Sequence, residues 1–328
     1  MKRYVTTVLC LVFLLLLAIF TSLSLGSTHI PLRSLLRAIF GDPAYATECT
    51  ILVHIRLSRT LAALVAGAGL SLSGVILQSV MANPLAGPST IGVNAGAGFF
   101  VILSLSLFPT LTFLLPLFAT LGALLVTLLV LIAARGVGGG RATIILAGIA
   151  CTALFQAGIS FFSVLDTDIL AEYTAFSVGG LSGVRLATLP VPATLILVAL
   201  LGALLLSRPL SALTLGDAQA SALGIRVRPL RTLALLLASL SAAAAISFAG
   251  LLGFVGLVVP HIARRLVGPR LTRLFIVSPL VGALLLLVSD LGARTLFAPS
   301  DIPVGIVTAL IGAPCFFVLL LRGRYHHA

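Results

Sequence analysis

The chain has 328 residues, of which 9% are charged and 60% are hydrophobic, and its mean hydropathy is +1.25. Soluble domains carry roughly 25% charged residues, so this composition excludes an ordinary soluble protein and indicates an all-α polytopic membrane protein. The net charge of +12 resides mainly in short loops between apolar runs, which indicates membrane orientation and argues against nucleic-acid binding.

Long apolar runs recur along the whole chain, with no linker that would separate a second domain. We therefore predict a single transmembrane domain over residues 1–328 with about ten spanning helices, given that roughly 20 residues cross a bilayer. Their predicted cores are residues 4–25, 57–81, 91–107, 111–134, 142–165, 189–207, 230–250, 253–268, 274–295 and 303–322. A cleaved signal peptide is the alternative for the first run, but this run exceeds the roughly 7–15 residues of a signal core.

Basic residues are unevenly distributed when the spans alternate from an inner N-terminus. Six of them then lie on the outer side: Arg33, Arg37, Arg56, Arg59, Arg185 and Arg294. The other fourteen of the 20 lysines and arginines lie on the inner side, as the positive-inside rule requires. This asymmetry predicts that both termini are cytoplasmic.

Missing residue types exclude several kinds of chemistry. Lys2 is the only lysine, so the chain lacks a glycine-rich phosphate loop with its lysine and is not expected to hydrolyse ATP. His54 and His261 have no ligand partner three or four residues away, and the four cysteines lack metal-ligand spacing. We predict a non-catalytic protein that holds no metal and no cofactor of its own.

Ionisable residues are nearly absent from the cores of the predicted spans, which argues against an intramembrane relay of protons. Asp290 is the exception, and Arg294 lies one helical turn further along the same span. An i,i+4 pair of opposite charges near a helix end is interpreted first as a structural ion pair. A proton-relay role for Asp290 is the alternative.

Residues 208–229 form a polar stretch between two apolar runs on the predicted inner side. Thr214 and Asp217 have the spacing of a capping box, and Gly224 is typical of the position just past a helix end. We predict a helix of about two turns, which is too short to cross the membrane and needs a partner surface. Its small side chains suit a protein cleft better than the lipid interface, which is the alternative location.

Several stretches together carry a family resemblance. They are LGDAQASALG at 215–224, residues 56–97 with the turn Asn83-Pro84-Leu85-Ala86, residues 253–268 and residues 289–317. In this order they resemble the FecCD-type permease subunits of type II ABC importers, which take up iron siderophores, haem or cobalamin. The resemblance is weakest over residues 1–50 and 98–140.

The resemblance implies a multi-pass permease in the cytoplasmic (inner) membrane, surrounded by lipid and paired with a second copy of itself. Two cytoplasmic ATPase subunits, which bind ATP and Mg, would dock on residues Leu215, Gly216, Asp217, Ala218, Ser221, Leu223 and Gly224. The fifth span and the segment after it would line the path. Gly140, Arg141 and Thr143, where the fifth span begins, would lie near an inner gate.

The resemblance also implies that Arg56, Arg59 and Arg294 meet glutamates of an external substrate-binding protein. Arg56 and Arg59 open the second predicted span, where cations oppose the helix dipole and need an acidic partner. Arginine suits this role because it pairs with carboxylates in a defined geometry. Binding of lipid phosphate is the alternative.

The substrate and two further classes of function stay open at this point. A ferric siderophore is the first prediction for the substrate, with haem and cobalamin as alternatives. An ion-coupled secondary transporter would move its substrate without an ATPase, and a scaffold or channel would need neither an ATPase nor a substrate.

Overall fold

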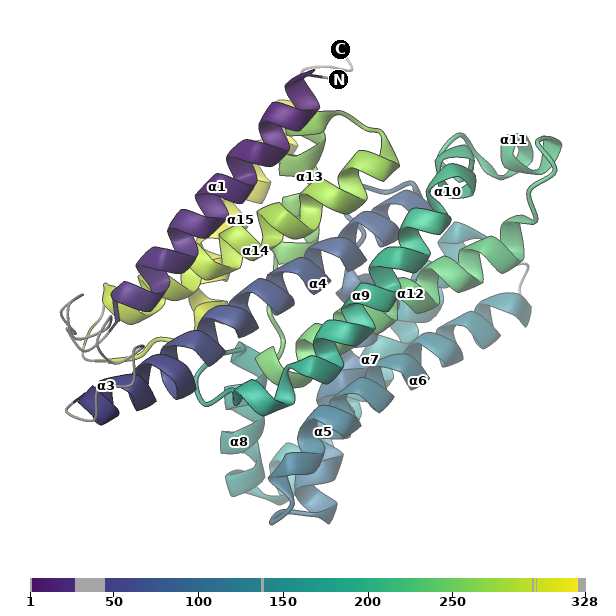
Figure 1. The fold of residues 1–328 in the computed structure, drawn as a ribbon. Coiled ribbons are helices and arrows are strands. Elements are labelled where there is room, and N and C mark those ends of the chain that lie inside the picture. The colour runs from purple at the N-terminus through teal and green to yellow at the C-terminus, as the bar shows by residue number, and fades with distance from the viewer. Residues whose placement is uncertain (1, 27–44, 137–138, 297, 299, 324–328) are drawn as a thin grey trace.

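The computed structural model describes residues 2–26, 45–136, 139–296, 298 and 300–323, with side chains up to residue 318. All regular elements in this part of the chain are helices, which confirms the predicted all-α fold (Figure 1). The α-helices are α1 (Lys2–Ser24), α3 (Ala46–Thr50), α4 (Ser58–Met81), α5 (Val93–Leu107), α6 (Leu115–Gly136), α7 (Arg141–Leu165), α8 (Thr167–Val178), α9 (Pro190–Leu205), α10 (Ser207–Leu213), α11 (Asp217–Ala222), α12 (Val227–Ala249), α13 (Val255–Val267), α14 (Leu271–Thr295) and α15 (Val304–Gly323). A π-helical segment, η2 (Ile51–Leu57), joins α3 to α4, and 3₁₀ turns occur at η3 (Pro88–Ile91), η4 (Thr112–Leu114) and η5 (Leu186–Thr188).

Each of the ten predicted spans overlaps one of these helices over most of its length. In the described residues, seven helices are long and apolar enough to cross a bilayer. Of the other three, α5 has 15 residues and α13 has 13, because glycines interrupt the apolar sequence before each of them, and the side chains of α15 are described only over Val304–Val318. The multi-pass class is therefore confirmed, while the number of ten spans stays a prediction.

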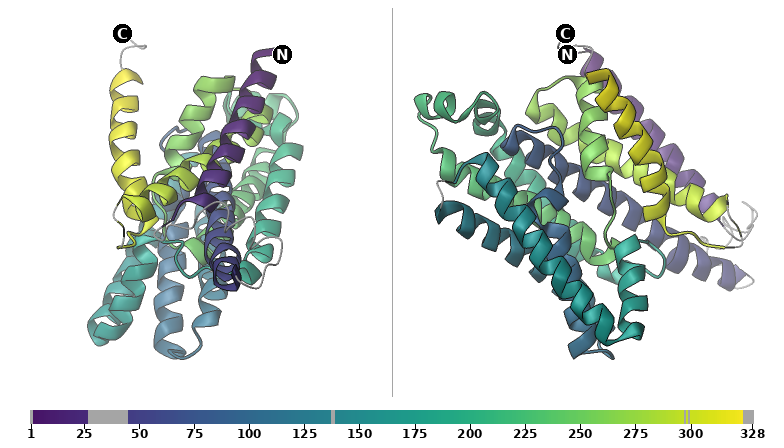
Figure 2. Two further views of the ribbon diagram at one scale, coloured as in Figure 1. Left: turned by 60° about the vertical axis from the view of Figure 1, so that its left-hand side comes forward. Right: turned by 180° about the vertical axis from the view of Figure 1, so that it is seen from behind.

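The core of the bundle is built around α4, which is buried along most of its length and packs against α12, α13 and α14 (Figures 1 and 2). Glycines allow these helices to approach closely. A Cβ atom on Gly67 would overlap the backbone carbonyl of Gly282 on α14, and one on Gly74 would overlap that of Gly256 on α13. In lipid, the hydrophobic effect does not drive helices together. Close backbone contacts of this kind stabilise their association instead.

Filling one of these contacts should destabilise the bundle. We expect Gly67→Ala to lower the free energy of unfolding by about 1–3 kcal/mol, because the added methyl group must displace the α14 backbone. Gly292→Ala is the matched control, since its Cβ would meet only Leu296 at 3.8 Å. The thermal unfolding midpoints of both variants in detergent test this, and equal midpoints would contradict the packing argument.

The helix that contains the second predicted span begins earlier than expected. Ala46–Met81 is one continuous helix of 36 residues. Arg56 and Arg59 therefore lie well inside it, so the predicted conflict with the helix dipole at its N-terminus is wrong. The π-helical turns of Ile51–Leu57 also change the spacing of side chains just before Arg59.

A further helix, α8, follows the fifth predicted span and was not predicted as a helix. The Asp166 carboxylate caps its start by accepting hydrogen bonds from the backbone N–H groups of Asp168 and Ile169. An aspartate at this position is a strong N-cap signal. The segment after the fifth span is thus a short helix that returns along the end of the bundle.

The bundle has two distinct ends (Figure 1). The start of α1, the last turns of α15 and the short helices α10 and α11 lie toward one end, here called the terminal end. The helices α3 and α8 lie toward the opposite end. Figure 2 shows the same grouping from behind. The two sets of predicted site residues therefore fall at opposite ends of the molecule.

Candidate functional sites at the two ends of the bundle

The short helix α11 projects from the terminal end, as a helix of six residues that follows α10 (Figure 1). Its existence and its end were predicted, since Gly224 follows it with φ at +79°. The predicted capping box is wrong, because the Thr214 hydroxyl donates to the Ser211 carbonyl instead. The N-cap is Gly216 with φ at +123°, a conformation that side chains with a Cβ rarely adopt.

Asp217 opens α11 and is the counterion of two arginines. Nη2 of Arg231, on α12, donates to both carboxylate oxygens at 2.6 Å, and Nη2 of Arg141, on α7, lies 3.4 Å from Oδ1. The Arg231 side chain is only 4% exposed. Because a buried guanidinium is costly without a partner, Asp217 fastens α11 to α12 and to the start of α7.

The predicted gate residues lie beside this ion pair, where α7 begins. Gly140 is the N-cap of α7, Arg141 is its first residue, and Thr143 is half-buried in the first turn. Arg141 also donates to the carbonyl of Leu213 at the end of α10. The structure thus brings Arg141 into direct contact with the coupling segment (residues 208–229), while the roles of all three gate residues stay predictions.

The outer surface of α11 is largely uncovered in the single chain. Only Ala220 is buried among its six residues. Leu215 is 67% exposed and Leu223 is 65% exposed. The other exposed members of the predicted docking set are Asp217, Ala218, Ser221 and Gly224, while Gly216 is half-buried. Two exposed leucines beside a short polar helix form a surface that a second protein can cover.

At the opposite end, Arg59 is the centre of a buried charge cluster. Its Nε donates to Asp290 Oδ1 at 2.7 Å, and its two Nη atoms donate to the two oxygens of Asp301 at 2.6 and 3.0 Å. The Ser182 hydroxyl accepts a further hydrogen bond at 3.1 Å. Asp290 itself is fully buried. Arg59 therefore joins α4 to α14, to the segment before α15 and to the segment after α8.

Arg294 lies on the other side of Asp290, with Nε 3.5 Å from Oδ2. The Asp290–Arg294 contact is present, but Arg59 is the closer partner. Arg294 also donates to the carbonyl of Ser22 at 2.8 Å, and Arg56 donates to those of Leu23 and Ser24, so both arginines hold the end of α1.

The three arginines predicted to dock a binding protein are all buried: Arg56 is 2% exposed, Arg59 8% and Arg294 5%. Their docking role stays a prediction. It requires these side chains to break the contacts that they make with carboxylates and backbone carbonyls of their own chain.

Asp301 lies outside the helices, and its side chain is 40% exposed. The hydrogen bond from Arg59 lowers the pKa of Asp301, and the Ser182 hydroxyl lowers it further. Because the folded pKa is depressed, the stabilisation from this contact is present above the ordinary aspartate pKa. It is lost as the pH falls through the lower folded value.

Sequence reasoning missed two residues of these clusters, Asp301 and Ser182. It also missed the pairing of Arg231 with Asp217. A signal existed for the last pair. Asp217 is the only acid predicted on the inner side, and Arg231 lies only 14 residues further along the chain. In the described part of the chain, no three His, Cys, Asp or Glu residues gather where they could hold a metal ion.

The arrangement of helices matches that of a known class of membrane transport protein. A solved structure described as an inward-facing conformation of a metal-chelate type ABC transporter is similar to this chain with a TM-score of 0.86 and 32% identity. The match covers 96% of this chain and 98% of that chain. The fold therefore places the chain in the class of ABC transporters.

The FecCD transport family model matches residues 14–322, and the chain belongs to this family. The hemin transport system permease protein HmuU of Yersinia pestis is 37% identical over 96% of each chain. The iron(3+)-hydroxamate import system permease protein FhuG of Bacillus subtilis is 37% identical over 97% of each chain. The ferric enterobactin permease protein FepD of Escherichia coli is 36% identical over 95% of this chain and 94% of its own. The resemblance stated from the sequence motifs is confirmed.

Proposed function

We propose that this chain is the permease subunit of an ATP-driven importer that moves an iron chelate, first of all a ferric siderophore, into the cytoplasm. The observation that carries the proposal is full-length similarity to permeases named for ferric hydroxamate and ferric enterobactin. Haem is the alternative substrate, because a permease named for hemin transport is equally similar.

The energy for transport would come from separate ATPase subunits that dock on α11. The exposed Leu215 and Leu223 support such docking, because they offer apolar contact area beside a helix held firmly at its first residue. Movement of α11 would pull on α12 through the Asp217–Arg231 pair. It would also pull on the predicted inner gate through Arg141. Closure of the ATPase subunits on binding ATP would then change the side of the membrane to which the transport path is open.

A second copy of the chain would complete the path. Gln156 and Ser160 lie one turn apart on α7, and both are exposed in the single chain. Polar side chains near the middle of a spanning helix are unfavourable against lipid but suit an aqueous path or a second protein surface. This stripe supports the placement of α7, followed by α8, along the path of a homodimer.

The arginine-rich outer end would receive the binding protein, with Arg56, Arg59 and Arg294 as candidate partners for its carboxylates. The internal acids Asp290 and Asp301 would then compete with that protein for Arg59. The excess of basic residues at the terminal end supports an inner-membrane location with both termini cytoplasmic.

The test is uptake in a strain from which the gene is deleted and then restored. The panel consists of labelled ferric siderophores, haem and cobalamin, and ATPase-dead complexes serve as the control for energy supply. We expect uptake of one ferric siderophore class to be lost on deletion and regained on complementation. Unchanged uptake of all of them, together with no ATPase subunit co-purifying with the chain, would contradict the proposal. Transport by the purified chain alone, driven by an ion gradient, would favour the secondary transporter.

A further inference from the structure

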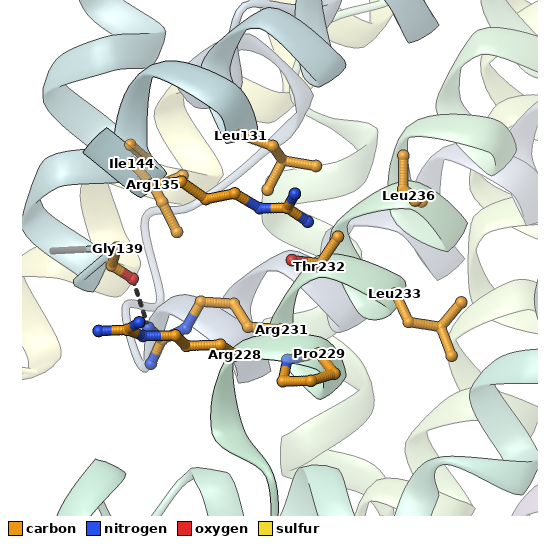
Figure 3. A pocket seen from close by; sticks show the side chains of 11 residues that line it. Leu131, Arg135, Gly139, Ile144, Arg228, Pro229, Arg231, Thr232, Leu233 and Leu236 are labelled. Carbon is orange, nitrogen blue, oxygen red and sulfur yellow. Dashed lines mark hydrogen bonds between the residues drawn. The ribbon is translucent and has the colours of Figure 1, made fainter. Parts of the chain in front are cut away.

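A cavity of about 580 Å³ opens at the terminal end between α6, α12 and the start of α7 (Figure 3). One part of its wall is basic and is formed by Arg135, Arg228 and Arg231. The rest is mainly apolar, formed by residues such as Leu131, Leu233 and Leu236. The function proposed above uses Arg231 of this lining but assigns no ligand to the cavity.

The basic wall has more positive charge than its neighbours neutralise. Arg231 is paired with Asp217, the only acid of the coupling segment, and its Nε still has no hydrogen-bond partner in the described chain. Arg135 and Arg228 are both exposed, and no ion pair to either is found among the described residues. Figure 3 shows Arg135 extending from α6 toward the helix that carries Thr232. This part of the cavity is therefore complementary to an anion.

Exposed apolar side chains on α6 lie close in sequence to the lining residue Leu131. Leu233 is 47% exposed at the cavity, and on α6 Leu128 is 51%, Leu129 41% and Ile132 55% exposed. Exposed leucines and isoleucines on a spanning helix face hydrocarbon. The cavity thus combines a positively charged wall with an apolar wall that adjoins exposed apolar side chains of a spanning helix. A ligand that fits both parts has an anionic head and long apolar chains.

We propose that this cavity binds one molecule of an anionic phospholipid, with its phosphodiester between Arg135 and Arg228 and its acyl chains along the leucines. Basic pockets between helices on the cytoplasmic side favour acidic headgroups, because the arginines stay near water while apolar chains remain in the bilayer. A protein partner would cover the arginines but would leave the exposed apolar side chains of α6 unexplained.

Lipid in this position would also bear on the coupling segment. Arg231 lines the cavity and holds Asp217 and the Gly139 carbonyl at the same time. An anion beside Arg135 and Arg228 reduces the repulsion that these arginines exert on Arg231. The lipid therefore favours the arrangement in which α11 is fastened to α12. This inference does not depend on which chelate the protein carries.

Native mass spectrometry tests the proposal on the full-length chain, purified with the subunits that accompany it. Phosphatidylglycerol and phosphatidylcholine of identical acyl chains are titrated onto the delipidated protein. We expect tighter binding of phosphatidylglycerol, weakened about fivefold by Arg135→Gln or Arg228→Gln alone and about twentyfold by both. Arg208→Gln is the matched control, since Arg208 is an exposed arginine of the same end, outside the cavity. Leu233→Gln should weaken lipid binding with both arginines intact.

Four outcomes would overturn the proposal. The double variant could bind phosphatidylglycerol as tightly as the wild type, or phosphatidylcholine could bind equally well. Millimolar inorganic phosphate could displace the lipid completely, which would indicate a site for free anions. The double variant could lose an ATPase subunit while keeping its lipid, which would make the cavity a protein contact. Because both arginines are exposed, the variants should fold, and their elution profiles and thermal midpoints check this.

Discussion

Replacing Asp217 with alanine is expected to lower substrate uptake about tenfold while ATP hydrolysis by the partner subunits continues. The change removes the counterion of Arg231, whose side chain is 4% exposed, and the second contact to Arg141. A tenfold loss corresponds to about 1.4 kcal/mol, near the lower limit for hydrogen bonds to charged groups. The free-energy loss lies near this lower limit because the Asp217 side chain is 46% exposed and partly screened by solvent.

Uptake and ATPase activity of the reconstituted complex, measured together, provide the test. Asp217→Glu keeps the charge and should retain most of the uptake, whereas Gly216→Val should behave like Asp217→Ala. A side chain at Gly216 would be strained at φ +123° and would collide with the Gln219 side chain. Glu48→Ala, at a half-buried acid of α3 at the opposite end, is the control. Normal uptake in Asp217→Ala at normal expression would refute the coupling role of α11.

Replacing Asp290 with alanine should have the largest effect on stability of any single substitution in the outer charge cluster. Asp290 is fully buried, lies 2.7 Å from Arg59 Nε and 3.5 Å from Arg294 Nε, and balances both. Removing one partner of a buried ion pair costs about 3–5 kcal/mol, because the remaining charge is left without compensation. We expect a clearly lower thermal midpoint and reduced yield of folded protein in detergent.

Asp301→Asn is the graded comparison for this prediction. Its side chain is 40% exposed, so solvent replaces part of the lost contact and the midpoint should fall much less. The same pair of variants separates a structural role from a docking role for Arg59. A structural role predicts that Asp290→Ala lowers the thermal midpoint, while the protein that still folds keeps its affinity for the binding protein. If Asp290→Ala kept the wild-type midpoint, the cluster would not hold the outer end together.

Prediction and structure agree better at the terminal end than at the outer end. At the terminal end, the short helix and its glycine stop were predictable, since they depend on neighbours in sequence, whereas the contact of this helix with Arg141 was not predicted. At the outer end, Arg59 was predicted to face a partner protein. The structure gives it Asp290 and Asp301 instead, which are 231 and 242 residues away. No local pattern reports such a pairing, although an acid inside an apolar span signals that a distant cation must exist.

The amino-acid sequence by itself determined the class of protein. Continuous apolar runs specify membrane helices because backbone hydrogen bonds must be satisfied within each span. The ordered motifs indicate the family. Only the tertiary structure decided which charges neutralise which, because burying Arg59, Asp290 and Arg294 together depends on the packing of α1, α4 and α14. It also decided where charge is left over, in the arginine-lined cavity between α6 and α12.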